Sequence, residues 1–561
     1  MKPISSNMFK LTAISAMILS TTSASAALYQ VIEVKPQTTF AFESVYGVAI
    51  QPGNVVGGNS LGCFADGTTD CESSFKLAGE TRLVATHAGQ AIDGLSYREE
   101  APFGIDNGFI YVQDDERDFE RYCRTDLRYA ICETWADIRW NVWKKEINGD
   151  QTPNSIAFIE GQATPIDETK NVVVNSLTAN AEPIGITLTP GDVTGSRRNS
   201  VKALVANTSI NIDAGLQTRA WKTDGTYTVG SIAHEKTNNQ GNFYTSKGAI
   251  WDSSGTITEI SWQTTNPERD NRLAQGSLRD VTVKDGHIYA VGYNTFYDDR
   301  NFMQASVSSV KVGESNWITK PVTGATVREN GTGGDFIHSH SLLTAVNEHG
   351  IAIGEAKLSR AESGAYANRL FVVPDIKDPK ANFLNGSLFF AGAGGKAGAI
   401  NNFNEIVGQI DTEETREVGG KPRRKRGFIY PYGTELQGSV AERQAIFNNR
   451  AWLLDDLTNG SEFSDNNQYR IIAANDINDA GVIAATALKC TGGYDSTAHN
   501  AQCGAGKGQE KTVAVKLVPI AGQTHENISP RGTDELVVER NGAGLGLWSL
   551  ILGGLLWFRR K

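Results

Sequence analysis

The chain has 561 residues, a formal net charge of −10 and a hydrophobic content of 40%. An acidic protein of this kind repels nucleic acid and anionic lipid, so the composition argues against a polyanionic partner. With 58 glycines, 16 prolines and only 4 methionines, and with apolar residues in short Val/Ile-rich runs between turn residues, the chain is typical of β-structure.

The N-terminus has the pattern of a secretory signal peptide. Lys2 and Lys10 precede an apolar run over residues 11–19, and small residues follow up to Ala26. We therefore expect residues 1–26 to be removed by signal peptidase between Ala26 and Ala27, and the remaining chain to be exported.

The six cysteines fall into three pairs that are close in sequence: Cys63 with Cys71, Cys123 with Cys132, and Cys490 with Cys503. In an oxidising compartment an even number of closely spaced cysteines predicts disulfides. None of the pairs has the C-x-x-C spacing of a zinc site, so the metal interpretation is the weaker one.

One phrase recurs along the chain: an apolar strand, a tight polar turn and a second strand that often ends in Val-Gly. Its seven copies lie at residues 46–58, 103–112, 184–195, 281–292, 343–354, 397–409 and 474–486. The turn residue is Gly in six copies and Asn404 in the sixth, and Asn is the residue other than Gly that best tolerates a positive φ. Each copy therefore predicts a β-hairpin.

A second phrase, with an aromatic residue in its strand, follows most copies, as in residues 247–261 and 426–437. Together the two phrases supply four strands per repeat, which is the content of a propeller blade. We predict an all-β fold over residues 27–539: a β-propeller of about seven, six to eight, four-stranded blades. Tandem β-sandwich domains are the alternative.

Residues 114–149 break the β-pattern. Dense alternating charge and apolar residues at intervals of three to five predict a small helical insertion in two pieces, stapled by Cys123 and Cys132. The insertion would pack on the propeller, or Trp135, Trp140 and Trp143 would form an exposed aromatic recognition surface.

Residues able to carry chemistry are few. Asp335, His338 and His340 lie close together in the sequence and would suit a metal or a general base, although the segment is expected to be a connecting loop. Four acidic turn residues, Asp106, Asp285, Asp476 and Asp479, would cap turns or hold structural calcium, but no EF-hand spacing supports calcium. We expect no cofactor. The basic run at 419–427 is expected to be a solvated loop.

The tail, residues 540–561, has a glycine-rich step at Gly542, Gly544 and Gly546, then an apolar run, then Arg559, Arg560 and Lys561. It resembles the GlyGly-CTERM sorting signal of Gram-negative bacteria. The resemblance implies processing by rhombosortase, an intramembrane protease, after transient anchoring in the inner membrane. A retained anchor is the alternative, although a 16-residue apolar stretch from 543 to 558 is short for a span.

The repeats resemble HAF-type repeats of secreted bacterial proteins, most closely at Gly394 to Gly408 and Ala474 to Gly481. As a whole the chain resembles an uncharacterised family of exported proteins from marine Gram-negative bacteria. The resemblance implies an architecture and a location in the periplasm or at the cell surface, and it implies no activity.

No catalytic sequence motif is present, which favours a non-catalytic interaction module for an unknown protein or glycan ligand. The alternative is a propeller hydrolase or lyase that acts on extracellular carbohydrate or peptide. Propeller enzymes assemble their sites from single residues on different blades. A pair of carboxylates lining the axial channel would favour the enzyme, whereas a channel of Ser, Thr and Gly backbone would count against it.

Overall fold

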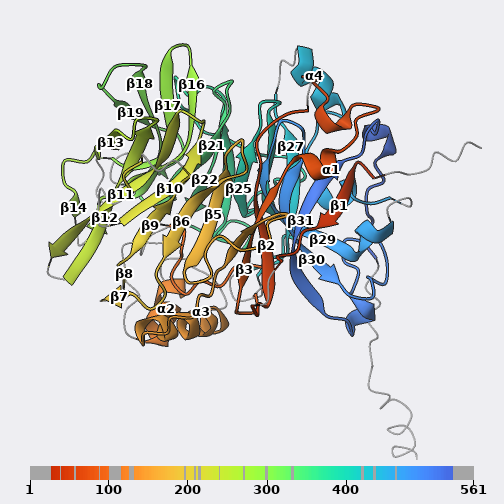
Figure 1. Ribbon diagram of the computed structural model, residues 1–561, viewed down its shortest axis with the longest axis horizontal. Coiled ribbons are helices and arrows are strands. Elements are labelled where there is room, and N and C mark those ends of the chain that lie inside the picture. Colours follow the sequence, from red (N-terminus) through yellow and green to blue (C-terminus); the bar gives the residue numbers. More distant parts are fainter. Residues whose placement is uncertain are drawn as a thin grey trace, which may run out of the picture.

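Figure 1 shows the computed structural model of the protein. It describes residues 27–534 except for short gaps at 38–39, 56–57, 87–88, 100–114, 125–131, 195–196, 207–209, 213–216, 239–240, 270–271, 297–300, 330–333, 418–421, 434–437 and 461–463. The expected signal peptide, the C-terminal tail and the repeat copy at 103–112 lie outside the described residues.

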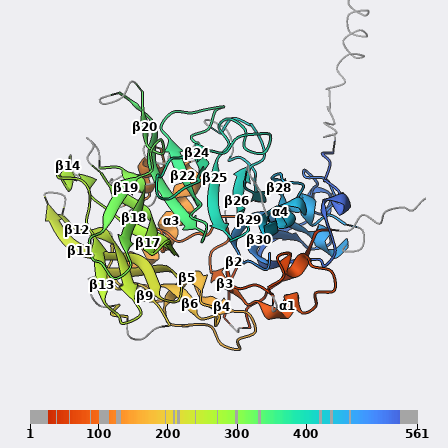
Figure 2. The same cartoon turned by 90° about the horizontal axis from the view of Figure 1, so that it is seen from above.

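Seven small antiparallel sheets stand side by side in a ring, which is the arrangement of a seven-bladed β-propeller (Figure 2). The predicted fold is confirmed, and tandem sandwiches are excluded. Among the described residues four blades have four strands, whereas blades 1 and 2 have three strands and blade 5 has five. The expectation of four strands in every blade was therefore too uniform.

The blades follow one another along the chain, and in the first six blades the strands pair in sequence order. Blade 1 has β2 (Ser44–Ile50), β3 (Leu77–Arg82) and β4 (Ala157–Ile159); blade 2 has β5 (Asn171–Leu177), β6 (Pro183–Leu188) and β9 (Val201–Leu204). Blade 3 has β10 (Gln217–Thr223), β11 (Tyr227–Asn238), β12 (Gly241–Asp252) and β13 (Ile257–Ile260); blade 4 has β16 (Ser277–Lys284), β17 (His287–Thr295), β18 (Met303–Lys311) and β19 (Ile318–Pro321).

The remaining blades complete the ring. Blade 5 has β20 (Val327–Arg328), β21 (Phe336–Val346), β22 (Ala352–Leu358), β23 (Asn368–Val373) and β24 (Asn382–Phe383); blade 6 has β25 (Gly395–Ile400), β26 (Glu405–Asp411), β27 (Lys425–Pro431) and β28 (Trp452–Leu453). In blade 7, β29 (Tyr469–Ile477), β30 (Ile483–Cys490) and β31 (Glu510–Pro519) are followed by β1 (Tyr29–Glu33). Two short hairpins, β7 (Val193–Thr194) with β8 (Arg197–Arg198) and β14 (Glu268–Arg269) with β15 (Arg272–Leu273), stand apart.

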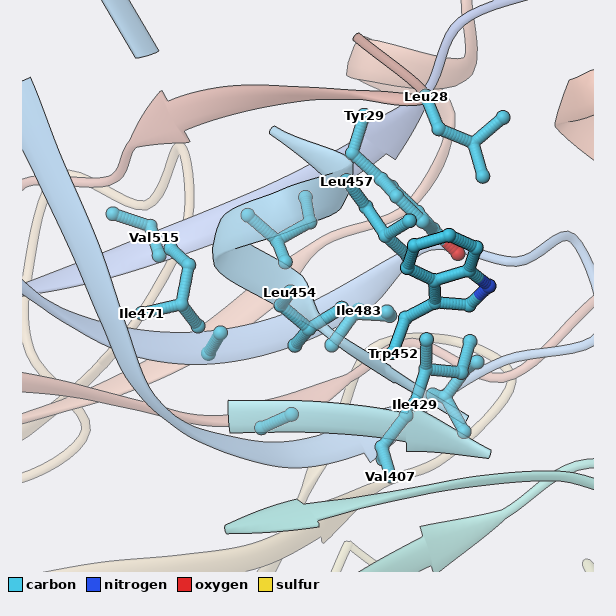
Figure 3. Packing of buried hydrophobic residues seen from close by; sticks show 14 of the residues in the cluster. Leu28, Tyr29, Val407, Ile429, Trp452, Leu454, Leu457, Ile471, Ile483 and Val515 are labelled. Atoms are coloured by element: carbon cyan, nitrogen blue, oxygen red, sulfur yellow. The ribbon is translucent and has the colours of Figure 1, made fainter. Parts of the chain in front are cut away.

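The first strand of the chain closes the ring. β1 is antiparallel to β31, with Tyr29 opposite Pro519 and Glu33 opposite Val515. Leu28 and Tyr29 are fully buried beside Leu454 and Leu457 (Figure 3). The backbone N–H of Leu28 donates to the carbonyl of Leu457 over 2.8 Å. Blade 7 therefore contains both the first and the last of the described strands.

Hydrophobic clusters lie between neighbouring blades. One cluster combines Val407 and Ile429 of blade 6 with Ile471 and Ile483 of blade 7. Another joins blade 7 to blade 1, with Val482 packed near Val45 and Leu77. Burial of apolar area between successive sheets is the main stabilising contribution, so each blade depends on both neighbours.

The repeat pattern located four of the inner hairpins. The turns between β16 and β17, β21 and β22, β25 and β26, and β29 and β30 contain Gly286, Gly350, Asn404 and Gly481, all with positive φ. The φ of Asn404 is 59°, which confirms the turn predicted there.

The hairpins predicted from two other copies, at 46–58 and 184–195, were wrong. β2 pairs with β3, which begins 27 residues later at Leu77, so the turn predicted at Gly53 does not join paired strands. In blade 2 the hairpin is β5–β6, and its residue with positive φ is Ala181 (60°), not the expected Gly191. A hairpin held by alanine in this region of φ gives no glycine or asparagine signal.

Side-chain amides link the hairpin turns of successive blades. Nδ2 of Asn347 donates to the Asn401 carbonyl (3.0 Å), and Nδ2 of Asn401 donates to the Asn478 carbonyl (3.1 Å). Asn478 continues to the Gln51 carbonyl (3.0 Å), and the amide of Gln51 reaches the Ala179 carbonyl (2.7 Å). Four amide links therefore connect blades 5, 6, 7, 1 and 2.

The helical insertion has the predicted two pieces, α2 (Glu116–Tyr122) and α3 (Cys132–Ile147), which lie at one end of the ring (Figure 1). The other helices are short: α1 (Cys71–Ser74), α4 (Gly438–Ala445), α5 (Leu454–Leu457) and 3₁₀ turns at Gly62–Phe64, Ser464–Gln468, Gly504–Gly506 and His525–Asn527. No helix in the described part of the chain is long and apolar enough to cross a membrane.

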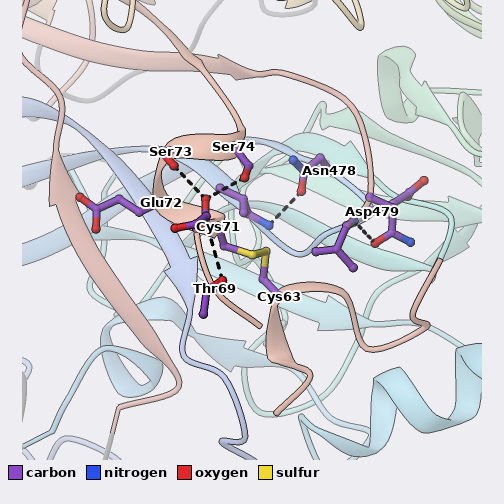
Figure 4. The surroundings of a disulfide bond; sticks show 12 residues. Cys63, Thr69, Cys71, Glu72, Ser73, Ser74, Asn478 and Asp479 are labelled. Atoms are coloured by element: carbon purple, nitrogen blue, oxygen red, sulfur yellow. Dashed lines mark hydrogen bonds between the residues drawn. A yellow bond between two sulfur atoms is a disulfide. The ribbon is translucent and has the colours of Figure 1, made fainter. Parts of the chain in front are cut away.

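All three predicted disulfides are present: Cys63–Cys71, Cys123–Cys132 and Cys490–Cys503. The Cys63–Cys71 bridge closes a loop beside Asn478 and Asp479 (Figure 4), and the N–H of Cys63 donates to the carbonyl of Ala480 over 2.9 Å. The bridge therefore fixes the loop of blade 1 on the hairpin turn of blade 7. Three disulfides indicate an oxidising compartment.

We predict that Asn478→Ala destabilises the ring by about 1–3 kcal/mol, because it leaves the partly buried carbonyl of Gln51 and the buried N–H of Val482 without their partners. Urea unfolding measures the change. The matched control is Asn180→Ala, an exposed turn asparagine of blade 2, which should alter the free energy of unfolding by less than about 0.5 kcal/mol. Equal losses in both variants would show that the amide link contributes nothing specific.

Candidate functional site

Every inner strand of the ring carries a shift in register. In blades 1 to 7 the residue that directly follows the shift is Ala49, Ser176, Lys222, Asp280, Ala345, Ala399 and Asp476, respectively. A β-bulge bends its strand and turns a side chain in a new direction. Because the inner strands surround the axis, the bulges place these seven residues at equivalent positions around it.

Three of these positions are charged, and their side chains interact. Nζ of Lys222 lies 3.5 Å from Oδ2 of Asp280, and Lys222 also attracts Asp476 electrostatically. The Lys222 side chain is 35% exposed, Asp476 is partly exposed, and Asp280 is buried at 2% exposure. We call Lys222, Asp280 and Asp476 the axial cluster.

Both carboxylates of the axial cluster accept backbone hydrogen bonds from two blades. Asp280 accepts from the N–H of Val281 (2.8 Å) in its own strand and of Val346 (3.0 Å) in blade 5. Asp476 accepts from the N–H of Ile477 (3.0 Å) and of Ile50 (3.0 Å) in blade 1. Each aspartate thus joins its own blade to the next one.

The cluster shifts the titration of its members. Burial raises the pKa of Asp280 and of Asp476, although Lys222 works in the opposite direction on both. Asp280 raises the pKa of Asp476 further. Burial also disfavours the charged ammonium of Lys222, but the two carboxylates outweigh it and raise its pKa. Carboxyl groups with raised pKa values are able to donate protons nearer neutral pH.

The insertion of blade 1 crosses the interior of the ring. Glu99 pairs with Arg279 of blade 4 (2.6 Å), and the neighbouring Arg98 binds Glu80 of β3 and Asn175 of blade 2. The same segment packs closely on α3 at Gly94. A side chain there would crowd the helix, because its Cβ would lie 3.2 Å from the backbone nitrogen of Trp143. Charged side chains therefore fill the interior on the side of the helices.

A groove of about 580 Å³ opens on the face formed by the hairpin turns. Its walls come from the turns of blades 1, 2 and 3, and it includes Pro52, Thr178, Glu182, Thr223 and Asp224. Thr223 directly follows Lys222 in the chain, and Pro52 lies two residues after Ile50, the partner of Asp476. The groove is therefore contiguous along the chain with the axial cluster.

The structure does not gather Asp335, His338 and His340 into one site. Asp335 is exposed and pairs with Arg360 (2.9 Å), while Nδ1 of His340 accepts from the N–H of Met303 (3.2 Å). His338 is 5% exposed and stacks on Phe383 with 4.6 Å between ring centroids. The three side chains face different neighbours, because two of them pack into the core of blade 5. Among the described residues no group of three or more His, Cys, Asp or Glu could hold a metal ion.

The acidic turn residues serve different purposes. Asp285 pairs with Lys377 (2.6 Å), and Asp479 accepts from the backbone N–H (2.9 Å) and the amide (3.0 Å) of Asn402. Asp476 lies in the axial cluster, not in a turn, and Asp106 lies outside the described residues. The sequence singled out Asp476 as a turn residue and missed Lys222 and Asp280.

Two interpretations about exposed surfaces were wrong: the alternative of an exposed aromatic surface on the insertion, and the expectation of a solvated basic loop. Trp143 is completely buried, and Trp135 and Trp140 pack on Phe119, so the three tryptophans form the core of the insertion instead of an exposed recognition surface. In the basic run, Arg423 is buried and donates to the carbonyls of Gly392, Ser363 and Thr415. These hydrogen bonds hold neighbouring loops together. Arg426 is buried beside Asp455, at 3.0 Å.

We predict that His338 makes the protein sensitive to acid. Burial, aided by Arg369, lowers the pKa of His338 to about 4, whereas an unfolded histidine titrates near 6.5. As the pH falls below about 6.5 the unfolded state takes up the proton first, so stability is lost, by about 3 kcal/mol at pH 4. His338→Phe should remove this part of the pH dependence in urea unfolding between pH 7 and 4. The control His287→Phe, at a partly exposed strand position, should keep the wild-type profile, and a profile unchanged in both variants would contradict the prediction.

Comparisons with known proteins identify the family. No curated protein matches the chain. The Trypanosoma rangeli sialidase in complex with the inhibitor DANA aligns at 9% identity, covering 88% of this chain and 60% of the sialidase, with a TM-score of 0.28. An α-L-arabinanase mutant from Cellvibrio cellulosa aligns at 10% identity over 44% of this chain and 85% of the arabinanase, with a TM-score of 0.22. This chain thus spans 60% of the sialidase, and at such TM-scores neither similarity supports a conclusion about activity. Residues 199–561 match the family described as protein of unknown function (DUF3466), and the chain therefore belongs to that family.

Proposed function

We propose that this protein is an exported hydrolase or lyase that acts on extracellular carbohydrate or peptide at the axis of the ring. The axial cluster carries the proposal. Two aspartates and a lysine from three different blades occupy equivalent bulge positions, and Lys222 and Asp476 are partly exposed. A partly exposed carboxylate beside an ammonium group, assembled from different blades, is an arrangement that a propeller enzyme can use.

The three residues suit different roles. Asp476, whose pKa is raised, would give a proton to the leaving group while the bond to that group breaks. In hydrolysis, water would add to the other fragment and return a proton to Asp476. Lys222 would stabilise negative charge that develops on the substrate. Asp280, which is buried, would hold the ammonium of Lys222 in place and not touch the substrate.

A non-catalytic interaction module is the second candidate. One observation favours it: each oxygen of the Asp280 and Asp476 carboxylates accepts a backbone N–H, so the cluster also has a structural purpose in joining blades. In that case the ring would bind a protein or glycan ligand without changing it.

The cellular setting is part of the proposal. The disulfides support export. We propose that signal peptidase removes residues 1–26, and that the tail anchors the protein in the inner membrane until rhombosortase processes it. Mass spectrometry of the protein from fractionated cells would identify both ends and the compartment.

We predict that Asp476→Asn lowers turnover at least about 100-fold, because it removes the proton donor but keeps an acceptor for the N–H of Ile50. Lys222→Met should have an effect of similar size. The assay measures new reducing ends or new amino termini after incubation with a panel of polysaccharides and unfolded proteins. The control Asp285→Asn changes an exposed aspartate in the turn that follows β16, five residues after Asp280 in the chain, and should keep full turnover.

Two results would decide against the enzyme. One is the absence of turnover by the wild-type protein on any member of the panel. The other is an Asp476→Asn variant that is as active as the wild type and equally stable. Either result would leave the interaction module as the function.

A further inference from the structure

The groove on the hairpin-turn face lies where the amide links between blades stop. Asn347, Asn401, Asn478 and Gln51 join the turns of blades 5, 6, 7, 1 and 2 in series. The next two turns, residues 178–182 in blade 2 and 223–227 in blade 3, are fully described, and no hydrogen bond joins them. These two turns are therefore not linked to each other, although Asn175 and Ser176 of blade 2 donate to the carbonyls of Ala220 and Trp221 in blade 3. The groove lies between the two unlinked turns.

The floor of the groove is apolar and belongs to the packing between blades 2 and 3. Ile184 is 2% exposed, and Val205 packs with it in the same cluster. Ile210 adds to the cluster of blade 3. Ile184 lies in β6, whereas Val205 and Ile210 lie in the connection between β9 and β10 and pack on the apolar residues of blades 2 and 3. A volume of about 580 Å³ lies within the range of small-molecule sites, roughly 300–1,000 Å³.

The rim is polar and carries only negative charge. Its side chains include the carboxylates of Glu182, Asp224 and Asp252, the amide of Asn180 and several Thr and Ser hydroxyls, and none of the described residues that line the groove is Lys, Arg or His. Asp224 uses Oδ1 to accept the N–H groups of Thr226 and Tyr227, and in the described residues its Oδ2 has no protein partner. The rim thus offers acceptors for hydroxyl donors.

We propose that this groove binds an uncharged, polyhydroxylated ligand, a neutral carbohydrate, next to the axial cluster. Sugar hydroxyls would donate to the carboxylates and accept from the hydroxyls and the amide, while C–H faces of the sugar lie on Ile184 and Val205. An acidic sugar or a phosphate would meet three carboxylates without a compensating cation and would be repelled. This inference rests on the proposed function for the reaction, but not for the binding itself.

The experiment measures binding of the full folded chain to an array of neutral, acidic and amino-containing oligosaccharides, followed by titration calorimetry with the best ligand. Asn180→Trp adds a bulky ring at an exposed turn residue of the groove whose side chain makes no hydrogen bond in the described residues. Its matched control is Ser315→Trp, which adds the same ring at an exposed turn of blade 4, away from the groove.

We expect the wild type and Ser315→Trp to bind neutral oligosaccharides equally, acidic ones at least about tenfold more weakly, and Asn180→Trp to lose at least about tenfold in affinity. Binding confined to acidic or amino sugars, absence of binding to every neutral sugar, or equal binding by both tryptophan variants would overturn the inference.

Failure of the inference and failure of the proposed function are distinguishable. Turnover that depends on Asp476 but is unaffected by Asn180→Trp would support the proposed enzyme and contradict carbohydrate binding in the groove. Binding of neutral carbohydrate in the groove without any chemical change would support the groove as a binding site and identify the protein as a binding module.

Discussion

Apolar packing between successive sheets holds the ring together, and the amide links between hairpin turns set how blades 5, 6, 7, 1 and 2 are placed within it. An asparagine side chain at this position closes its own turn through Oδ1 and donates through Nδ2 to the same position in the next blade. One residue therefore fixes a local conformation and the placement of a neighbour at once. This double use explains why an asparagine stands three residues before the positive-φ residue in the hairpins of blades 5, 6 and 7, because a different residue would satisfy only one of the two demands.

Variation at the equivalent positions of the ring supplies its chemistry. The bulge positions hold small residues in blades 1, 2, 5 and 6, but Lys222, Asp280 and Asp476 in blades 3, 4 and 7. The turn positions hold linking amides in blades 5, 6, 7 and 1, and the series ends at blade 2, beside the groove. The two departures from regularity lie next to each other, since Thr223 of the groove follows Lys222.

Sequence patterns predicted the all-β ring, the three disulfides and the helical insertion, because each leaves a local signal: a period, a spacing or a change in charge pattern. They also located the hairpins around Gly286, Gly350, Asn404 and Gly481. They missed the blade 2 hairpin, whose turn uses Ala181. The axial cluster was not predictable in the same way, because a bulge leaves no composition signal and the cluster joins residues from three blades. An alignment of the seven repeats would have shown that the bulge position is charged in blades 3, 4 and 7 and uncharged in the other four blades.

Pairing of β1 with β31 has a kinetic consequence. β1 is made long before its partner β31, so the contact that closes the ring joins residues about 490 positions apart in the sequence. Contacts of such sequence separation carry a large loop-closure entropy and form late and slowly. Six blades can assemble while the seventh still presents an unpaired strand edge, which is a hazard for aggregation. The order of synthesis thus affects stability through the five residues of β1. A chain whose β1 has not yet paired would be less stable, and it would unfold more easily for passage through a narrow pore.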